Sequence, residues 1–204
     1  MHDVGIIAYG MGNLRSVANA CRFLGVEPLL CSTPDQLGSC RRIILPGVGA
    51  FGDGMTRLRH GGWDHELTRE VCERGKPFLG VCLGMQLLAA VGTEHGSHRG
   101  LGWIDGTVER IVQIDGVRIP HIGWNDVTPT RQDGVFEGMT VAPVFYFIHS
   151  YVLRPADERI VTSRCDYGEP FVSSIHVNNI TATQFHPEKS QKAGLHVLKR
   201  FLGS

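Results

Sequence analysis

One cysteine of this chain lies in a pattern typical of a catalytic nucleophile. Cys82 has Gly80 two residues before it and Gly84 two residues after it, between a short apolar run and an amphipathic one. This is the spacing of a nucleophile elbow, a strained turn between strand and helix that exposes the reactive side chain. The positive end of that helix would help the thiol to lose its proton. The pattern predicts covalent chemistry at Cys82; the alternative is a small buried cysteine at a strand end.

A base and an orienting carboxylate follow near the carboxyl end. Residues 181–185 are typical of a strand, and they lead into His186, Pro187 and Glu188. Proline disfavours a helical conformation for the residue before it, so we expect His186 to be extended. Residues two apart in an extended segment project to the same side, which predicts that Glu188 lies beside the imidazole. Cys82, His186 and Glu188 thus supply a nucleophile, a base and an orienting group.

Attack on an amide also requires fixed donors for the developing oxyanion. The predicted strand 43–45 is followed by a glycine-rich turn, in which the N–H groups of Gly47, Val48 and Gly49 could serve as such donors. The N–H of Leu83, directly after the predicted nucleophile, could supply another. Taken alone, a turn of this composition would be an ordinary flexible connection.

A second glycine pair, Gly10 and Gly12, invites a dinucleotide-binding interpretation. The pair follows the first predicted strand, but the third glycine of that fingerprint is missing because position 15 is Arg. A lone G-x-G is a weak signal. We therefore predict no nicotinamide or flavin, and no other cofactor.

Composition and charge limit the class of protein. With 204 residues, of which 42% are hydrophobic, the chain can bury one sizeable core, so we expect a single domain over residues 1–204. Twenty basic residues balance twenty acidic ones, and no basic cluster follows a predicted helix, which argues against a nucleic-acid partner. Six cysteines lack the spacing of a zinc site or a disulfide framework, so we expect no metal and reduced thiols.

Targeting signals are not evident in the sequence. The chain begins without a charged and then apolar leader, and no apolar run approaches the roughly 18 residues of a membrane span. Neither secretion nor membrane insertion is expected. The expected compartment is the cytoplasm.

Hydrophobic periodicity predicts an α/β fold with a mostly parallel central sheet, flanking helices and antiparallel hairpins in the C-terminal half. The first half alternates strands and helices, whereas turn pairs mark two hairpins in the second half. The predicted strands are 4–8, 29–31, 43–45 and 78–81; the hairpins are 108–119 about Asp115-Gly116 and 171–185 about Asn178-Asn179. Helices are predicted from residue 14 to Gly25, before Gly75, after Cys82 and from about residue 190.

Six ordered segments resemble the class I, or triad, glutamine amidotransferases, and the resemblance extends over essentially the whole chain. The elbow and the His-Pro-Glu segment are shared across that family. Three other segments, 10–16, 46–51 and 121–125, are similar to the branch of glutaminase subunits of imidazole glycerol phosphate synthase, which serves histidine biosynthesis. The six segments are 9–16, 46–51, 80–86, 121–125, 149–151 and 184–191.

The resemblance implies hydrolysis of the side-chain amide of L-glutamine to glutamate and ammonia, through a glutamyl thioester on Cys82. It also implies that Gln86 and Glu94 contact the α-amino end of the substrate. Ser150 and Tyr151 would bind the substrate through their main chain. From the sequence alone, Gln86 could equally be a solvated helix residue and Glu94 a surface loop carboxylate.

The resemblance further implies a heterodimer with a TIM-barrel cyclase, which receives the ammonia through its interior. That cyclase makes imidazole glycerol phosphate and an aminoimidazole carboxamide ribonucleotide. The residues implied at the interface are Asn13, Arg15, Ser16, Trp124 and Lys189. Asn13 could alternatively cap a helix, and Trp124 could be a core aromatic residue.

Three further hypotheses remain open at this stage. The turn 46–49 could be misoriented in the free subunit, so that the oxyanion hole forms only when the cyclase is docked and loaded. The chain could instead serve another acceptor synthase, such as one of anthranilate or pyridoxal phosphate synthesis. A non-catalytic or peptidase-like relative on the same scaffold is a third alternative.

Overall fold

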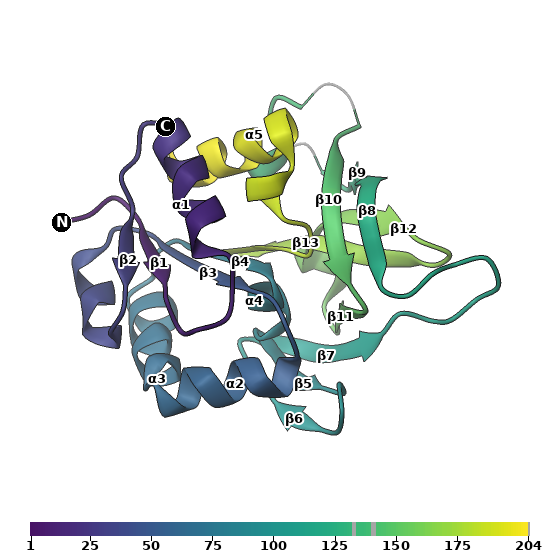
Figure 1. Ribbon diagram of the computed structural model, residues 1–204, viewed down its shortest axis with the longest axis horizontal. Helices are drawn as coiled ribbons and strands as arrows, with labels where there is room; N and C mark the ends of the chain where they lie inside the picture. Colours follow the sequence, from purple (N-terminus) through teal and green to yellow (C-terminus); the bar gives the residue numbers. More distant parts are fainter. Residues whose placement is uncertain (132–133, 140–141, 204) are drawn as a thin grey trace.

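The computed structural model describes residues 1–131, 134–139 and 142–203. Its central feature is an eight-stranded sheet with the strand order β2-β1-β3-β4-β14-β13-β12-β9 (Figure 1). The first five strands run parallel and the last three are antiparallel, so the prediction of a mostly parallel sheet with antiparallel additions is confirmed. In sheet order the strands are β2 (Leu29–Cys31), β1 (Gly5–Ile7), β3 (Ile43–Gly47), β4 (Phe78–Cys82), β14 (Ile180–Thr183), β13 (Pro170–Val177), β12 (Val161–Asp166) and β9 (Thr128–Pro129).

Helices cover both faces of the parallel part of the sheet. On one face lie α1 (Leu14–Phe23) and α5 (Gln191–Leu202), and on the other lie α2 (Phe51–His60) and α3 (Trp63–Leu67), which continues into the π-helical segment η2 (Thr68–Glu73) (Figure 1). Each face of the sheet has its own hydrophobic core. Successive strand residues contribute to opposite cores because their side chains point to opposite faces. Ile6 and Ile44 pack in the cluster with α1 and α5, whereas Ile7 and Leu45 pack in the cluster with α2 and α3.

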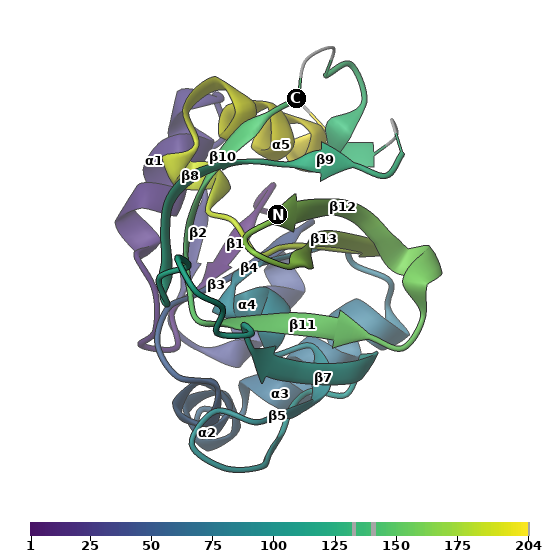
Figure 2. The same ribbon diagram turned by 90° about the vertical axis from the view of Figure 1, so that its right-hand side faces the viewer.

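Two smaller sheets complete the C-terminal half. One pairs β10 (Val144–His149) with β8 (His121–Asp126), and the other has the order β11-β7-β5-β6. Figure 2 shows β7 and β11 side by side beneath β12 and β13. A third hydrophobic core, rich in phenylalanine, lies between α5 and the strands of the C-terminal half. The remaining elements are β11 (Tyr151–Pro155), β7 (Ile104–Arg110), β5 (Ala89–Gly92), β6 (His98–Arg99), α4 (Leu83–Gln86), and the 3-10 turns η1 (Pro34–Ser39), η3 (Gly134–Phe136), η4 (Glu158–Ile160) and η5 (Pro187–Lys189).

One predicted hairpin is confirmed and the other is wrong. Strands β13 and β14 pair in antiparallel fashion across a turn at Asn178 and Asn179. The chain also turns at Asp115 and Gly116, but no strand flanks that turn among the described residues. The strand that precedes the turn, β7, ends at Arg110. It pairs with β11 instead, and its Val108 packs in the core.

The helix predicted after Cys82 is only one turn long. It spans Leu83–Gln86, and the chain then enters β5 at Ala89. Residues 83–89 are all buried, and apolar periodicity cannot distinguish a buried strand from a buried helix over so short a run. Among the described residues, no helix is both long and apolar enough to cross a membrane.

Candidate active site

Three adjacent parallel strands deliver the predicted active-site segments to one edge of the sheet. β4 ends at Cys82, β3 beside it ends at Gly47, and β14 on its other side leads to His186. Gly47 and Cys82 are register partners. Parallel strands carry their carboxyl ends at the same edge, so residues far apart in sequence meet there.

Cys82 has the strained backbone of a nucleophile elbow. Its φ of 54° and ψ of −109° are unusual for a residue with a side chain. A Cβ at Gly84 would lie 1.9 Å from the carbonyl oxygen of Leu45, and one at Gly80 would lie 2.7 Å from the oxygen of Gly84. The two glycines are therefore required because backbone occupies the space that a side chain would need.

The predicted contact between His186 and Glu188 is present. Nδ1 of His186 lies 2.8 Å from Oε1 of Glu188, and both side chains are buried. Burial lowers the pKa of His186, but the interactions with Cys82 and Glu188 outweigh it and raise that pKa to about 10. Nε2, the other ring nitrogen, is buried without a hydrogen-bond partner in the described part of the chain. The imidazole is thus held at Nδ1 and lies within electrostatic reach of Cys82.

The helix that follows Cys82 is short. A helix of four residues has few aligned peptide dipoles, and α4 is no longer than that. The imidazole of His186 is the other group that acts on the cysteine, because the Coulombic interaction with Cys82 heads the causes that raise the pKa of His186.

Gln184 is a residue that the sequence did not single out. It is fully buried, and its Nε2 donates to Sγ of Cys82 at 3.7 Å while its Oε1 accepts from Nε2 of Gln86 at 3.1 Å. Gln86 donates its other hydrogen to the carbonyl of Tyr151 at 2.8 Å. These bonds fix the direction of both amides, so an N–H of Gln184 points at the nucleophile. Its position in the His-Pro-Glu segment was the only signal in the sequence.

A pocket of about 350 Å³ opens beside the sulfur. It brings together most of the residues predicted to bind substrate or the oxyanion, whereas Gly47 lies within β3. Gly49 has a φ of 109°, a conformation that favours glycine. The pocket is lined by Val48, Gly49, Ala50, Cys82, Leu83, Gln86, Glu94, Pro120, Ile148, His149, Ser150 and Tyr151.

The structure excludes the alternative for Gln86, whereas Glu94 is a half-buried turn residue. Gln86 is buried, so it is not a solvated helix residue. Both hydrogens of its amide are engaged, which leaves Oε1 as an acceptor. Glu94 accepts the N–H of Phe51, the first residue of α2, at 2.8 Å through one oxygen. Each side chain thus lines the pocket and holds an acceptor oxygen that an ammonium group can use.

Two buried histidines beside the pocket were also missed. Nδ1 of His149 lies 3.0 Å from the carbonyl of Tyr151, and its Nε2 lies 3.1 Å from Nδ1 of His121. Burial lowers the pKa of His121 to about 4 and, together with the proximity of His121, that of His149 to about 3. Both rings are neutral at pH 7. Their contacts fix His149, the last residue of β10, which lines the pocket.

The residues predicted at a partner interface lie at the surface. Asn13 caps α1 through a bond from the N–H of Ser16 to Oδ1 at 3.2 Å, as the alternative prediction had it. Trp124 is 48% exposed and packs edge-on against Tyr146, so it is not a core aromatic residue. Nζ of Lys189 lies 5.5 Å from the centre of the same Tyr146 ring. Arg15 is exposed on α1.

Comparison with known proteins agrees with this geometry. Residues 6–203 match the family described as Glutamine amidotransferase class-I. The chain belongs to this family. It is 48% identical to the imidazole glycerol phosphate synthase subunit HisH of Aquifex aeolicus over 96% of the chain and 94% of that protein. It is 43% identical to the subunit of the same description from Rhodopirellula baltica, over 97% of the chain and 96% of the relative.

Solved structures of amidotransferases share the fold. One described as a glutamine amidotransferase superposes with a TM-score of 0.76 and 25% identity, covering 98% of this chain and 99% of the other. PurLQS from Thermotoga maritima gives a TM-score of 0.78 at 22% identity, with 100% and 99% covered, and shows the fold alone. The resemblance to the class I amidotransferases, and within them to the glutaminase subunit of imidazole glycerol phosphate synthase, is confirmed.

Proposed function

We propose that this amidotransferase hydrolyses L-glutamine through Cys82, His186 and Glu188, in one domain over residues 1–204. The observation that carries the proposal is the buried imidazole of His186, held by Glu188 at Nδ1 and electrostatically coupled to the sulfur. The thiolate attacks the amide carbon and the C=O electrons move to oxygen. Collapse of this intermediate breaks the C–N bond, and the imidazolium gives its proton to the departing ammonia.

Water completes the cycle in the proposed mechanism. The now neutral imidazole takes a proton from water, whose oxygen attacks the thioester carbon. The C–S bond breaks, glutamate leaves and Cys82 returns as a thiolate beside imidazolium. Gln184 donates to the sulfur whenever it carries negative charge, which stabilises the free enzyme and the leaving thiolate.

Substrate binding follows from the lining of the pocket. The acceptor oxygens of Gln86 and Glu94 would hold the α-ammonium group, and the main chain of Ser150 and Tyr151 would hold the rest of the α-amino-acid end. The N–H groups of Leu83 and of the turn Gly47, Val48 and Gly49 are the proposed oxyanion donors.

The proposed partner is a TIM-barrel cyclase that receives the ammonia and forms imidazole glycerol phosphate and an aminoimidazole carboxamide ribonucleotide. Its docking surface would include the outer face of the β8–β10 sheet, which exposes apolar side chains next to the pocket. Asn13, Arg15, Ser16 and Lys189 would lie at its border. The apolar members are Ile122, Trp124, Val144 and Ile148.

Docking would also complete the oxyanion hole. Met11, in the loop before α1, lies against the turn 46–49, since a Cβ on Gly49 would be 2.8 Å from its Cε. A partner that contacts the start of α1 can therefore shift the turn. We propose that this turn is reoriented by the loaded cyclase and that ammonia then passes into the cyclase through a closed channel.

Glutamate production tests this function. Wild type, Cys82→Ala and Cys72→Ala are each measured alone and with a histidine-pathway cyclase plus its nucleotide. We expect strong activity of wild type and Cys72→Ala only in the full mixture, and none for Cys82→Ala. Equal activity with and without the cyclase would overturn the gating. Stimulation by a different acceptor synthase would overturn the partner, and full activity of Cys82→Ala would overturn the mechanism.

A further inference from the structure

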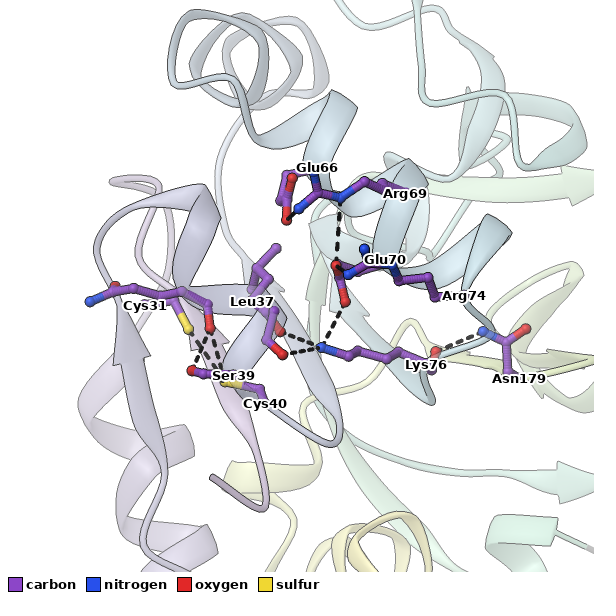
Figure 3. Close-up of polar contacts among 12 residues, drawn as sticks. Cys31, Leu37, Ser39, Cys40, Glu66, Arg69, Glu70, Arg74, Lys76 and Asn179 are labelled. Carbon is purple, nitrogen blue, oxygen red and sulfur yellow. Dashed lines mark hydrogen bonds and ion pairs between the residues drawn. The ribbon is translucent and has the colours of Figure 1, made fainter. Parts of the chain in front are cut away.

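Two cysteines outside the catalytic site lie side by side. Sγ of Cys31, the last residue of β2, is 3.9 Å from Sγ of Cys40, the residue after η1 (Figure 3). Both residues are 0% exposed. A Cβ at Gly5 would lie 2.7 Å from the Cys40 sulfur and 2.9 Å from the Cys31 sulfur, so the fold leaves room for the pair. The two sulfurs form one buried dithiol.

The dithiol lies away from the glutaminase chemistry. The two sulfurs meet beside Gly5, which begins β1, and Cys40 precedes β3. Cys82 ends β4, which is separated from β2 by β1 and β3 in the sheet. The mechanism proposed above uses neither sulfur of the pair.

A half-buried ammonium group holds the segment that covers the dithiol. Nζ of Lys76 donates to the carbonyl oxygens of Leu37 at 2.5 Å and Gly38 at 3.1 Å, both in η1 (Figure 3). The same nitrogen lies 2.7 Å from Oε2 of Glu70, which is fully buried. Lys76 therefore anchors η1 and places a positive charge near the sulfurs.

This environment shifts the pKa values of the two thiols in opposite directions. The hydrogen bond from Cys31, helped by Ser39 and Lys76, outweighs burial and lowers the pKa of Cys40 to about 7. The same hydrogen bond, with burial, raises the pKa of Cys31. Cys40 is thus the sulfur of the pair that loses its proton more readily, the property that a reactive thiol requires.

We propose that Cys31 and Cys40 are a site of reversible oxidation to a disulfide, with a hydroperoxide as the oxidant. The Cys40 thiolate attacks one peroxide oxygen, the O–O bond breaks, and Cys40 becomes a sulfenic acid. The Cys31 sulfur then attacks the sulfenic sulfur and expels hydroxide, which takes the Cys31 proton and leaves as water. Two thiols lose two electrons and two protons, and hydrogen peroxide is reduced to two waters.

Local geometry permits the bond to close. The sulfurs must approach from 3.9 Å to about 2 Å, and the ring they close includes residues 32–39. That segment carries exposed residues at Ser32, Thr33 and Asp35, whereas Leu37 packs in the core, so the exposed part of the segment is the part that can adapt. The oxidant reaches the sulfurs when η1 lifts, because η1 is the surface segment over them.

Other cysteines provide internal controls. Cys21 and Cys165 are buried like the pair, and burial raises their pKa to about 11 and about 12. In the described part of the chain, neither has a second sulfur at hydrogen-bond distance. We expect both to stay reduced under conditions that oxidise the dithiol.

Differential alkylation of the full chain tests the proposal. The protein is treated with hydrogen peroxide, alkylated with a light reagent, reduced with dithiothreitol, alkylated with a heavy reagent and digested with trypsin. One tryptic peptide, residues 23–41, contains both Cys31 and Cys40 and no other cysteine. We expect it to lack two hydrogens before reduction and to carry two heavy labels afterwards, while Cys21 and Cys165 carry light labels.

Several results would overturn the site. One is a peptide 23–41 that carries two light labels after Cys82 has been oxidised. Another is a stable sulfenic or sulfinic acid on Cys40 in the wild type. In Cys31→Ser the sulfenic acid on Cys40 should persist and react with dimedone, whereas Cys21→Ser should still form the disulfide. If Cys31→Ser fails to fold, the labels on the wild-type peptide 23–41 test the proposal by themselves.

Discussion

Nδ1 of His186 lies 2.8 Å from Oε1 of Glu188, and the two side chains are each only 3% exposed. Water cannot compete for this contact at such low exposure, so the carboxylate fixes both the tautomer and the orientation of the ring. The other nitrogen, Nε2, is buried and makes no hydrogen bond within the described part of the chain. It is therefore the ring atom left for the proton transfers proposed above.

Glu188→Gln should lower kcat while leaving the fold intact. The amide preserves the shape of the side chain but removes its charge and can turn its NH2 group toward Nδ1, which favours the wrong tautomer. We expect a decrease of about a hundredfold to ten-thousandfold in cyclase-stimulated glutamate production. Thermal unfolding of the variant serves as the control. A rate near that of wild type would contradict the role of Glu188.

His186 should remain protonated well above its ordinary pKa. In the folded protein this pKa is about 10, against an ordinary value of 6.5, because Cys82 and Glu188 outweigh burial. The associated stability is fully present below pH 6.5 and is lost as the pH rises through about 10. NMR titration of labelled histidine should show this imidazolium at pH 8. Cys82→Ser should lower the pKa, and an unchanged value would exclude the ion pair.

Gln184→Met should weaken the nucleophile without creating a cavity. The variant keeps the length of the side chain but removes the N–H directed at Cys82, a charge-assisted bond of about 1.5–3 kcal/mol. We expect alkylation of Cys82 by iodoacetamide at pH 7 to slow by about tenfold or more. Gln113→Met, at an exposed residue, is the control. Equal alkylation rates would remove Gln184 from the mechanism.

Acid should destabilise the chain through the buried histidine pair. The folded pKa values of His121 and His149 are lowered, mainly by burial, to about 4 and about 3. Their stabilising effect is therefore present above pH 6.5 and is lost as the pH falls toward 4. Urea unfolding at pH 7 and pH 5 should show a smaller unfolding free energy at pH 5. His121→Gln should flatten this dependence, and a steeper slope would contradict it.

Glu70→Gln should be costly although the residue is remote from the pocket. Glu70 is fully buried and lies 2.7 Å from Nζ of Lys76. Loss of its charge removes the carboxylate that faces Lys76, Arg69 and Arg74, and because these partners are partly exposed the cost should fall below the value of about 3–5 kcal/mol for a fully buried pair. Arg22→Ala removes the exposed pair with Glu27 and should cost much less. Equal unfolding free energies in the two variants would contradict this reading.

Local sequence signals predicted much of the fold and the core of the site. Strand β2 occupies its predicted residues, and α1 shows the predicted apolar spacing. The elbow at Cys82 and the contact of His186 with Glu188 depend on neighbours within a few residues. For that reason they could be inferred from spacing alone.

Contacts between distant segments could not be inferred from local spacing. Gln184 donates to Cys82, 102 residues away, and His149 pairs with His121, 28 residues away. The false hairpin near Asp115 has the same origin, since β7 finds its partner in β11 rather than in the next segment. Local patterns specify turns and strands, while pairing partners are chosen by the whole core.

The outer face of the β8–β10 sheet has a practical consequence for the isolated chain. Cross-strand neighbours Ile122 and Ile148 are 56% and 39% exposed, beside Trp124 at 48%. Exposed apolar side chains on neighbouring strands favour self-association. Chain produced without a binding partner should therefore become turbid as its concentration rises, and production together with a cyclase should keep it clear.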